Sequence, residues 1–188
     1  MFKKMIVVAA MALLAISAQV GTASASLANG GFETGDFSGW SVDAGSNWAM
    51  VIDTGAYAGT YHAELGTYGT AGTITHDAFA TTAGQQYTVS FALSNDSKDT
   101  TNVFQALWNG QIQALNPVLD ATQSTPYTLY KFTATADTTS SSLAFNFQND
   151  QSVFHLDNVD ATPTPIPAAF WLLGSGLAGL AGLRRKMA

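Results

Sequence analysis

Strict alternation of apolar and polar residues is the feature that most constrains how this chain can fold. Across residues 86–94 every second side chain is large and apolar, namely Tyr87, Val89, Phe91 and Leu93. A period of two places these side chains on one face of an extended strand, whereas a helix repeats every 3.6 residues. The same period returns in residues 127–135, where Tyr130 and Phe132 share a face, and in residues 143–147. The middle of the chain therefore consists of β-strands that each bury one face.

Turn signals separate further candidate strands. The dipeptide Asn109-Gly110, which favours a two-residue hairpin turn, lies between the apolar segments 103–108 and 111–115. Other short segments with strand-like composition are 48–53, 61–66, 72–79 and 153–159. Eight or nine short strands without a convincing helix predict an all-β domain over residues 26–160. We expect an antiparallel β-sandwich and, within that class, a jelly roll.

Charge is distributed unevenly along the chain. All 13 acidic residues lie between Glu33 and Asp160, where the only basic residues are Lys98 and Lys131. This middle segment carries a formal charge of −11, and we expect no nucleic-acid partner because phosphate binding requires Lys and Arg. The chain has no cysteine, so disulfides cannot clamp the fold, and a bound metal becomes a more plausible clamp.

The first 25 residues have the pattern of a signal peptide. Lys3 and Lys4 form a positive start, residues 5–18 are apolar, and Ala23-Ser24-Ala25 is a small-x-small cleavage site. We therefore expect an exported protein. A buried N-terminal helix is the alternative interpretation of the same residues.

The last residues form a three-part tail. Residues 161–167 are a stiff Pro/Thr linker, residues 168–183 are apolar, and Arg184, Arg185 and Lys186 follow. A helix over these 16 apolar residues would be about 24 Å long, short for a hydrocarbon core of about 30 Å. We expect a transmembrane helix whose basic end stays in the cytoplasm. An ordinary tail anchor fits the same pattern.

The order of these parts is also specific. Pro165-Ile166-Pro167-Ala168-Ala169, the apolar run, and then Arg184 and Arg185 resemble a PEP-CTERM sorting signal. The resemblance implies an exosortase-like processing enzyme as partner, an intermediate anchored in the inner membrane, and then release to the cell surface or exterior of a Gram-negative bacterium. Carriers of such tails are exported with exopolysaccharide in biofilm formers. Ile166 replaces the central Glu of the family, which leaves open which enzyme processes the tail.

A second resemblance spans the domain. Asn29-Gly30-Gly31-Phe32-Glu33 with Gly39-Trp40, residues 83–91, and the closing residues 154–159 are similar to galactose-binding-like jelly rolls and their carbohydrate-binding modules. The resemblance implies a structural Ca²⁺ shared by Glu33 and Asp157, with backbone oxygens near Gly59 completing the site. In the alternative interpretation, Glu33 caps a turn and Asp157 accepts hydrogen bonds from backbone amides.

Aromatic residues are the candidate ligand-binding groups, because sugar rings stack on exposed aromatic faces. The candidates for binding a polysaccharide lie at strand ends or in loops, and they are Trp48, Tyr57, Tyr68 and Trp108. Aromatic side chains also fill the cores of sandwiches. We expect Trp40 to be one of the core residues, since it closes the opening motif.

The sequence offers no assembled catalytic machinery. Glu33 and Glu64 are the only glutamates, and His62, His76 and His155 show no zinc-binding spacing. We therefore expect a non-enzymatic cell-surface or matrix protein associated with exopolysaccharide. The alternatives are a carbohydrate-binding module with a defined glycan and, less favoured, a small glycan-active hydrolase.

Overall fold

The computed structural model describes residues 27–43, 48–150 and 152–165. The expected signal peptide 1–25 and the apolar segment 168–183 lie outside these residues, as do Pro167, Arg184 and Arg185 of the expected sorting motif. Within the described part of the chain, no helix is long and apolar enough to span a bilayer.

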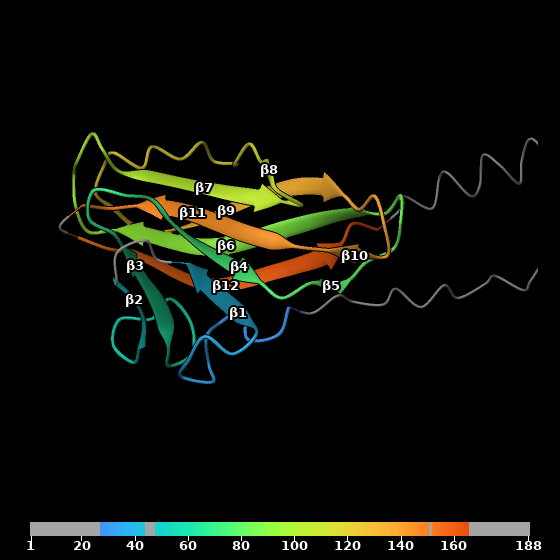
Figure 1. Ribbon diagram of the computed structural model, residues 1–188, viewed down its shortest axis with the longest axis horizontal. Helices are drawn as coiled ribbons and strands as arrows, with labels where there is room; N and C mark the ends of the chain where they lie inside the picture. The colour runs from blue at the N-terminus through green and yellow to red at the C-terminus, as the bar shows by residue number, and fades with distance from the viewer. Residues whose placement is uncertain (1–26, 44–47, 151, 166–188) are drawn as a thin grey trace, which may run out of the picture.

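The described residues form twelve strands in two five-stranded sheets and one small ribbon, and all the pairings are antiparallel (Figure 1). The first sheet has the spatial order β1 (Trp40–Asp43), β4 (Gly72–His76), β11 (Leu143–Gln148), β7 (Val103–Trp108) and β8 (Gln111–Ile112). The second has the order β2 (Trp48–Ile52), β3 (His62–Gly66), β12 (Phe154–Pro163), β6 (Gln86–Asn95) and β9 (Thr125–Thr135). The ribbon pairs β5 (Phe79–Ala80) with β10 (Ser140–Ser141).

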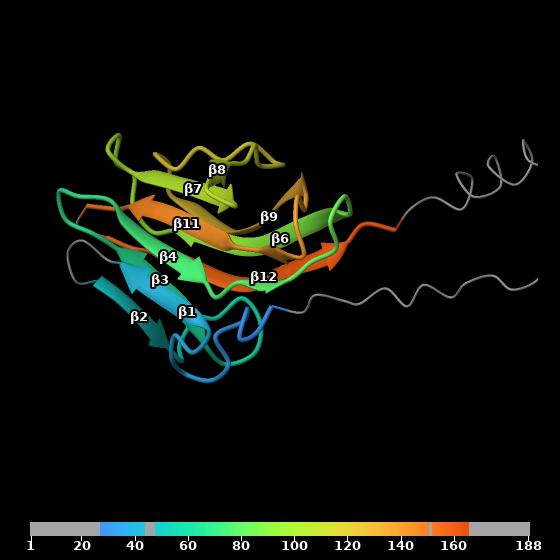
Figure 2. The same cartoon turned by 45° about the vertical axis from the view of Figure 1, so that its right-hand side comes forward.

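The two large sheets are stacked face to face as two layers, as the turned view also shows (Figure 2). The predicted all-β antiparallel sandwich is thus confirmed. Several boundaries differ from the prediction. The last strand, expected to end at residue 159, continues to Pro163, so residues 161–163 of the expected Pro/Thr linker pair with β6. The expected strand 72–79 is interrupted after β4, where the buried imidazole of His76 bonds to the carbonyl oxygens of Ala28 and Asp77. The expected strand 111–115 shortens to the two residues of β8.

Aromatic side chains from both sheets form the core. The predicted inward residues of β6, which are Tyr87, Val89, Phe91 and Leu93, are each at most 2% exposed. Phe145 of β11 crosses the interface to Phe91, with ring centroids 4.9 Å apart and the rings edge to face. Burying one such side chain stabilises the fold by about 1.5–3 kcal/mol, and the edge-to-face contact adds about 0.5–1.5 kcal/mol.

The opening segment packs against the last strand. Val159 donates its backbone N–H to the carbonyl of Gly30 at 2.8 Å. A Cβ on Gly30 would overlap the carbonyl oxygen of Val159, so the two backbones touch only because this residue is glycine. Trp40 is 6% exposed, and its indole N–H donates to the carbonyl of Asn29, which confirms the expectation that Trp40 packs. The two ends of the domain are therefore joined through direct backbone contact.

Candidate functional site

The face of the second sheet that points away from the core carries several polar and aromatic side chains, some exposed and some buried. In β12, Phe154 and Leu156 point into the core, so His155 and Asp157 point to the opposite side. His155 pairs with Glu64 of β3 in the strand register. We call this surface the outer face; its side chains are Trp48, Met50, His62, Glu64, Tyr127, Leu129, His155 and Asp157, and the loop 53–61 adds Tyr57.

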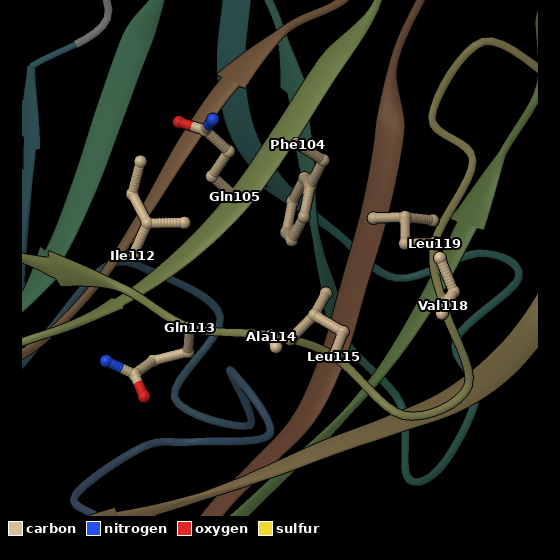
Figure 3. A pocket seen from close by; sticks show the side chains of 8 residues that line it. All are labelled: Phe104, Gln105, Ile112, Gln113, Ala114, Leu115, Val118 and Leu119. Carbon is tan, nitrogen blue, oxygen red and sulfur yellow. The ribbon is translucent and has the colours of Figure 1, made fainter.

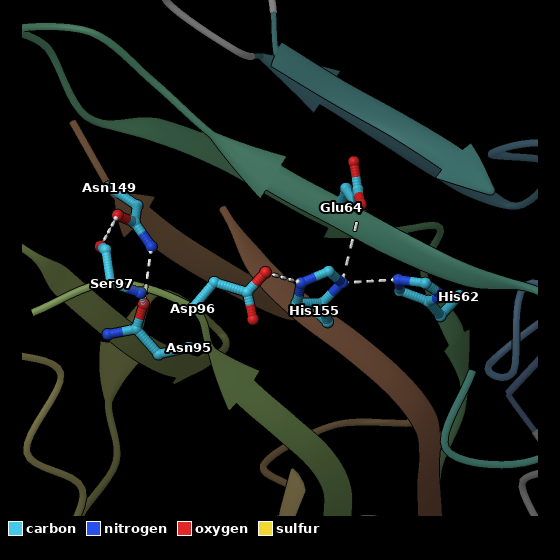
Figure 4. A network of polar contacts seen from close by, with 7 residues as sticks. All are labelled: His62, Glu64, Asn95, Asp96, Ser97, Asn149 and His155. Carbon is cyan, nitrogen blue, oxygen red and sulfur yellow. Dashed lines mark hydrogen bonds and ion pairs between the residues drawn. The ribbon is translucent and has the colours of Figure 1, made fainter. Parts of the chain in front are cut away.

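Two histidines and two carboxylates form a chain of contacts on the outer face (Figure 4). His155 Nε2 lies 2.9 Å from a carboxylate oxygen of Asp96, directly after β6. On its other side, His155 Nδ1 lies 2.7 Å from His62 Nε2 and 3.8 Å from a carboxylate oxygen of Glu64. We call His62, Glu64, Asp96 and His155 the histidine cluster. Its members come from β3, from β12 and from the residue directly after β6, and β12 lies between the other two strands.

A buried amide network fixes the segment that carries Asp96. The side chain of Asn149 donates to the side-chain oxygen of Asn95 and accepts a bond from the hydroxyl of Ser97. Asn149 is wholly buried, and Asn95 is 2% exposed. The residues on both sides of Asp96 are therefore anchored in the interior, which holds Asp96 beside His155 even though the Asp96 side chain is largely exposed.

Burial sets the protonation of the cluster. His62 is wholly buried, and its desolvation together with the charge on His155 lowers its pKa to about 4, against the charge on Asp96, which acts to raise it. His62 is therefore a neutral imidazole at pH 7. Among the described residues, His62 Nδ1 has no hydrogen-bond partner, so its sole polar contact there runs through Nε2 to His155.

Two tyrosines border the histidine cluster. The ring of Tyr127 in β9 lies with its centroid 6.3 Å from those of both His62 and His155, and 5.6 Å from that of Tyr57. Burial raises the pKa of Tyr127 above its usual range, and the negative charges of Asp157, Asp96 and Glu64 raise it further. The phenol therefore keeps its proton and can act as a donor, while Tyr57 is half exposed beside it.

The loop 53–61 is attached to the sandwich through two carboxylates. Glu33 accepts the backbone N–H groups of Thr60 and Tyr61 at 3.0–3.1 Å. Asp157 accepts those of Ala58 at 2.9 Å and Asn158 at 2.6 Å. The hydrogen bonds are those of the alternative interpretation, in which these carboxylates accept backbone amides.

The same two carboxylates also have the chemistry of a cation site. Asp157 is wholly buried, which raises its pKa, and the charge of Glu33 raises it further. In the described part of the chain, no Lys or Arg pairs with either carboxylate. Each oxygen keeps lone pairs beyond its amide bonds. Gly59, with φ +69°, approaches Glu33 so closely that a Cβ would overlap its carboxylate. The residues therefore fit a cation that offsets this buried negative charge.

The four predicted ligand aromatics separate into different environments. Trp108 is 3% exposed and lies in the core, with ring centroids 5.8 Å from Tyr87 and 5.7 Å from Phe79. Its ring faces are covered, so its assignment as a ligand residue is corrected to a core residue. Trp48 is 56% exposed on the outer face, and Tyr57 joins the histidine cluster through Tyr127. Tyr68 is exposed in the loop that follows β3.

The histidine cluster was not predicted from the sequence. The spacing His62-x-Glu64 puts both side chains on one face of a strand, which is a signal that the sequence does contain. His155 is 93 residues further along, and only the pairing of β3 with β12 brings it to them. The sequence does not mark Tyr127 as a site residue, because Tyr127 fits the alternating pattern of a strand like its neighbours.

A separate hollow lies at the edge of the first sheet (Figure 3). It measures about 220 Å³ and lies between β7–β8 and the loop 113–119. Its lining is mainly apolar, with Phe104, Ile112 and Leu119 among the side chains and no charged group. It offers packing surface but few groups that could orient a polar ligand.

Comparison with known proteins identifies the fold but no family. No protein-family model matches the chain. No curated protein matches it either. Among solved structures, the chain is similar to the CBM22-1 xylan-binding domain of Paenibacillus barcinonensis Xyn10C, with a TM-score of 0.55, 12% identity, and coverage of 78% of this chain and 99% of that one.

Two further structures show the same likeness. TmCBM61 in complex with β-1,4-galactotriose has a TM-score of 0.50 and 15% identity, covering 74% of this chain and 99% of that one. A Clostridium thermocellum xylanase containing CBM22-1 and GH10 modules, complexed with xylohexaose, has a TM-score of 0.57 and 14% identity. That match covers 75% of this chain but 29% of the xylanase. The described domain therefore has the β-sandwich fold of carbohydrate-binding modules.

Proposed function

We propose that the β-sandwich is a non-catalytic carbohydrate-binding domain and that the outer face is its sugar-binding surface. The observation that carries the proposal is the pair Tyr57 and Tyr127, whose ring centroids are 5.6 Å apart beside Glu64 and His155. Aromatic rings provide apolar faces for sugar C–H groups, and nearby polar side chains orient the hydroxyls. The fold shared with a xylan-binding and a galactotriose-bound module supports this choice of ligand class.

The exposed side chains of β2 extend the proposed surface. Trp48 is 56% exposed and Met50 is 39% exposed, and both lie on the same side of the sheet as Glu64. Leu129 of β9 is 47% exposed at the other side of the histidine cluster. Exposed aromatic and apolar residues on a rigid sheet usually signify binding. The proposed surface therefore reaches from one edge strand of the second sheet, β2, to the other, β9.

Binding to immobilised polysaccharides tests this proposal. We expect the purified chain to bind at least one polysaccharide among xylans, galactans and bacterial exopolysaccharides, and Tyr57→Ala to weaken that binding about tenfold, or ~1.4 kcal/mol. The readout is the dissociation constant from a glycan array followed by calorimetry on the best ligand. The loss is expected because the substitution removes an exposed ring face while leaving the core intact.

Tyr68→Ala is the comparison variant. The sequence makes Tyr68 a ligand candidate, but its exposed ring lies in the loop after β3 and is not one of the residues of the outer face. This variant should bind with unchanged affinity. If Tyr68→Ala lost binding while Tyr57→Ala kept it, the outer face would not be the binding surface. Release of soluble sugar by the wild type, abolished in Glu64→Gln, would instead assign the chain to the glycan-active hydrolases.

We further propose that Glu33 and Asp157 hold a structural Ca²⁺. Calcium prefers carboxylate and carbonyl oxygens. Glu33 and Asp157 approach the same loop from different ends of the chain, without a basic side chain to neutralise them in the described residues. A bound cation would supply the missing positive charge and tie together the opening segment, the loop 53–61 and β12.

Export and sorting complete the proposed function. The proposed sequence of events is cleavage after residue 25, a transient inner-membrane anchor at residues 168–183, and processing by an exosortase-like enzyme that delivers the domain to the cell surface. The intact mass of the exported protein tests it. We expect the mature chain to lack residues 1–25 and the residues beyond the Pro/Thr linker. An exported protein that retains Arg184 and Arg185 would contradict the processing step.

A further inference from the structure

We propose that His62, His155 and Glu64 bind a divalent transition-metal ion of the Zn²⁺ type on the outer face. The ligand atoms of these three residues all lie within 4.8 Å of one another. The site differs in donor chemistry and in residues from the pair Glu33 and Asp157, and it goes beyond the proposed sugar binding.

The strand pairing places the three donors without help from flexible loops. Glu64 lies two residues after His62 on β3, so the two side chains share a face, and His155 stands directly across from Glu64 in the β3–β12 register. His62 is wholly buried, and the side chains of His155 and Glu64 are 15% and 19% exposed. Ligands on rigid strands are held close to a binding geometry before the ion arrives.

The two imidazole nitrogens already face each other. His62 Nε2 and His155 Nδ1 are 2.7 Å apart. Two nitrogens bound to one tetrahedral Zn²⁺ at about 2.0–2.1 Å would be about 3.3 Å apart. The rings therefore need to separate by roughly 0.6 Å, measured against that tetrahedral spacing. The oxygen of Glu64 lies 3.8 Å from His155 Nδ1 and needs to approach by about 0.5 Å to reach the same spacing.

Asp96 supplies the outer contact that metal-binding histidines usually have. Its carboxylate holds the Nε2 side of His155 at 2.9 Å, which leaves the Nδ1 lone pair directed at His62 and Glu64. Such a carboxylate fixes the tautomer and orientation of the ring and raises its basicity as a ligand. The pairing of carboxylate and histidine thus matches the second-sphere support found around zinc, and the ion would replace the proton that lies between His62 Nε2 and His155 Nδ1.

The donor set selects the class of ion. Two imidazole nitrogens and one carboxylate suit Zn²⁺, Cu²⁺, Co²⁺ or Ni²⁺, whereas Ca²⁺ and Mg²⁺ take oxygen donors. Three protein ligands leave a fourth position, and the partial exposure of His155 and Glu64 lets solvent and the ion reach it.

Metal titration of the full-length chain tests the site. The protein, kept in mild detergent because of its apolar ends, is stripped with a chelator and titrated with Zn²⁺ in a calorimeter, and with Co²⁺ in an absorption spectrometer. We expect one ion per chain and visible cobalt bands of a four- or five-coordinate site. His155→Ala should weaken Zn²⁺ binding at least 100-fold, and Asp96→Asn about 10- to 100-fold.

Two further variants keep the outcome decisive. Glu64→Gln preserves the size of the side chain and should also lower the Zn²⁺ affinity, which covers the case in which His155→Ala fails to fold by circular dichroism. Asp137→Asn removes an exposed carboxylate in the loop after β9 and should bind Zn²⁺ like the wild type. Wild-type protein that gives neither heat with Zn²⁺ nor cobalt bands overturns the site. Equal Zn²⁺ affinity in the wild type and Glu64→Gln also overturns it.

Because no sugar is present in these titrations, their result is independent of the proposed sugar binding. A chain that binds one Zn²⁺ through the histidine cluster but no polysaccharide would keep this site and refute the carbohydrate-binding proposal. A chain that binds polysaccharide but no Zn²⁺ would keep the carbohydrate-binding proposal and refute the metal site.

Discussion

The variant Gly30→Ala is expected to lower the free energy of unfolding by about 3 kcal/mol, near the upper end of the usual cost of overpacking. The new Cβ would overlap the carbonyl oxygen of Val159, which is backbone and cannot rotate away. Relief requires the opening segment to move from β12, and this breaks the 2.8 Å hydrogen bond from Val159 N–H to the Gly30 carbonyl. Chemical denaturation followed by tryptophan fluorescence measures the change.

The neighbouring glycine provides the control. A Cβ on Gly31 would meet Glu33 Cγ at 3.7 Å and Asp157 Oδ1 at 3.8 Å, which are ordinary contact distances. Gly31→Ala should therefore change stability by less than about 1 kcal/mol, since it also restricts the unfolded chain. Equal losses in Gly30→Ala and Gly31→Ala would mean that the contact with Val159 does not hold the ends of the domain together.

Calcium is expected to raise the melting temperature of the chain by about 8 °C when its concentration is 100 times the dissociation constant. Binding to the folded state alone contributes about 2.7 kcal/mol at that ratio, and each kcal/mol shifts the midpoint by roughly 2–4 °C for a domain of about 150 residues. The stabilisation arises because the cation offsets the buried charge of Asp157 and the nearby charge of Glu33. Thermal melts after treatment with a calcium-selective chelator, with and without added calcium, measure the shift.

Glu33→Gln should remove this calcium-dependent rise, because the amide lacks the negative charge and one of the two acceptor oxygens. Asp137→Asn serves as the matched control, and its melting temperature should respond to calcium as the wild type does. If the wild-type midpoint were the same with chelator and with calcium, the two carboxylates would serve only to hold the loop 53–61 through its amides.

Strands with strong alternation were predictable because local pattern and burial agree in them. The inward residues of β6 and β11 are those that the period of two selects. The four residues of β1, of which three are exposed, carry no such pattern, so the sequence does not predict this strand. The prediction that Trp108 binds a ligand is wrong because it relied on the position of Trp108 just before a turn. Its alternation with Phe104 and Ala106 already placed it on the buried face.

The histidine cluster could not be predicted in the same way, because it depends on pairing between distant segments. His62 and Glu64 come from β3, His155 from β12, and Asp96 from the residue after β6. Their meeting requires both the strand order β3-β12-β6 and the register that sets His155 opposite Glu64. Many orders and registers satisfy the same hydrophobic pattern, so one sequence does not choose between them.

The direction of β12 decides how the domain would be presented by a tether at its C-terminal end. His155 lies near the beginning of this strand and Pro163 at its end, eight residues or about 26 Å away at about 3.3 Å per residue. A chain held through the segment after Pro163 would carry the histidine cluster at the end of the sheet that lies away from the point of attachment. The domain could then contact long polymers in the surrounding medium, and those polymers would not have to lie against the anchoring surface.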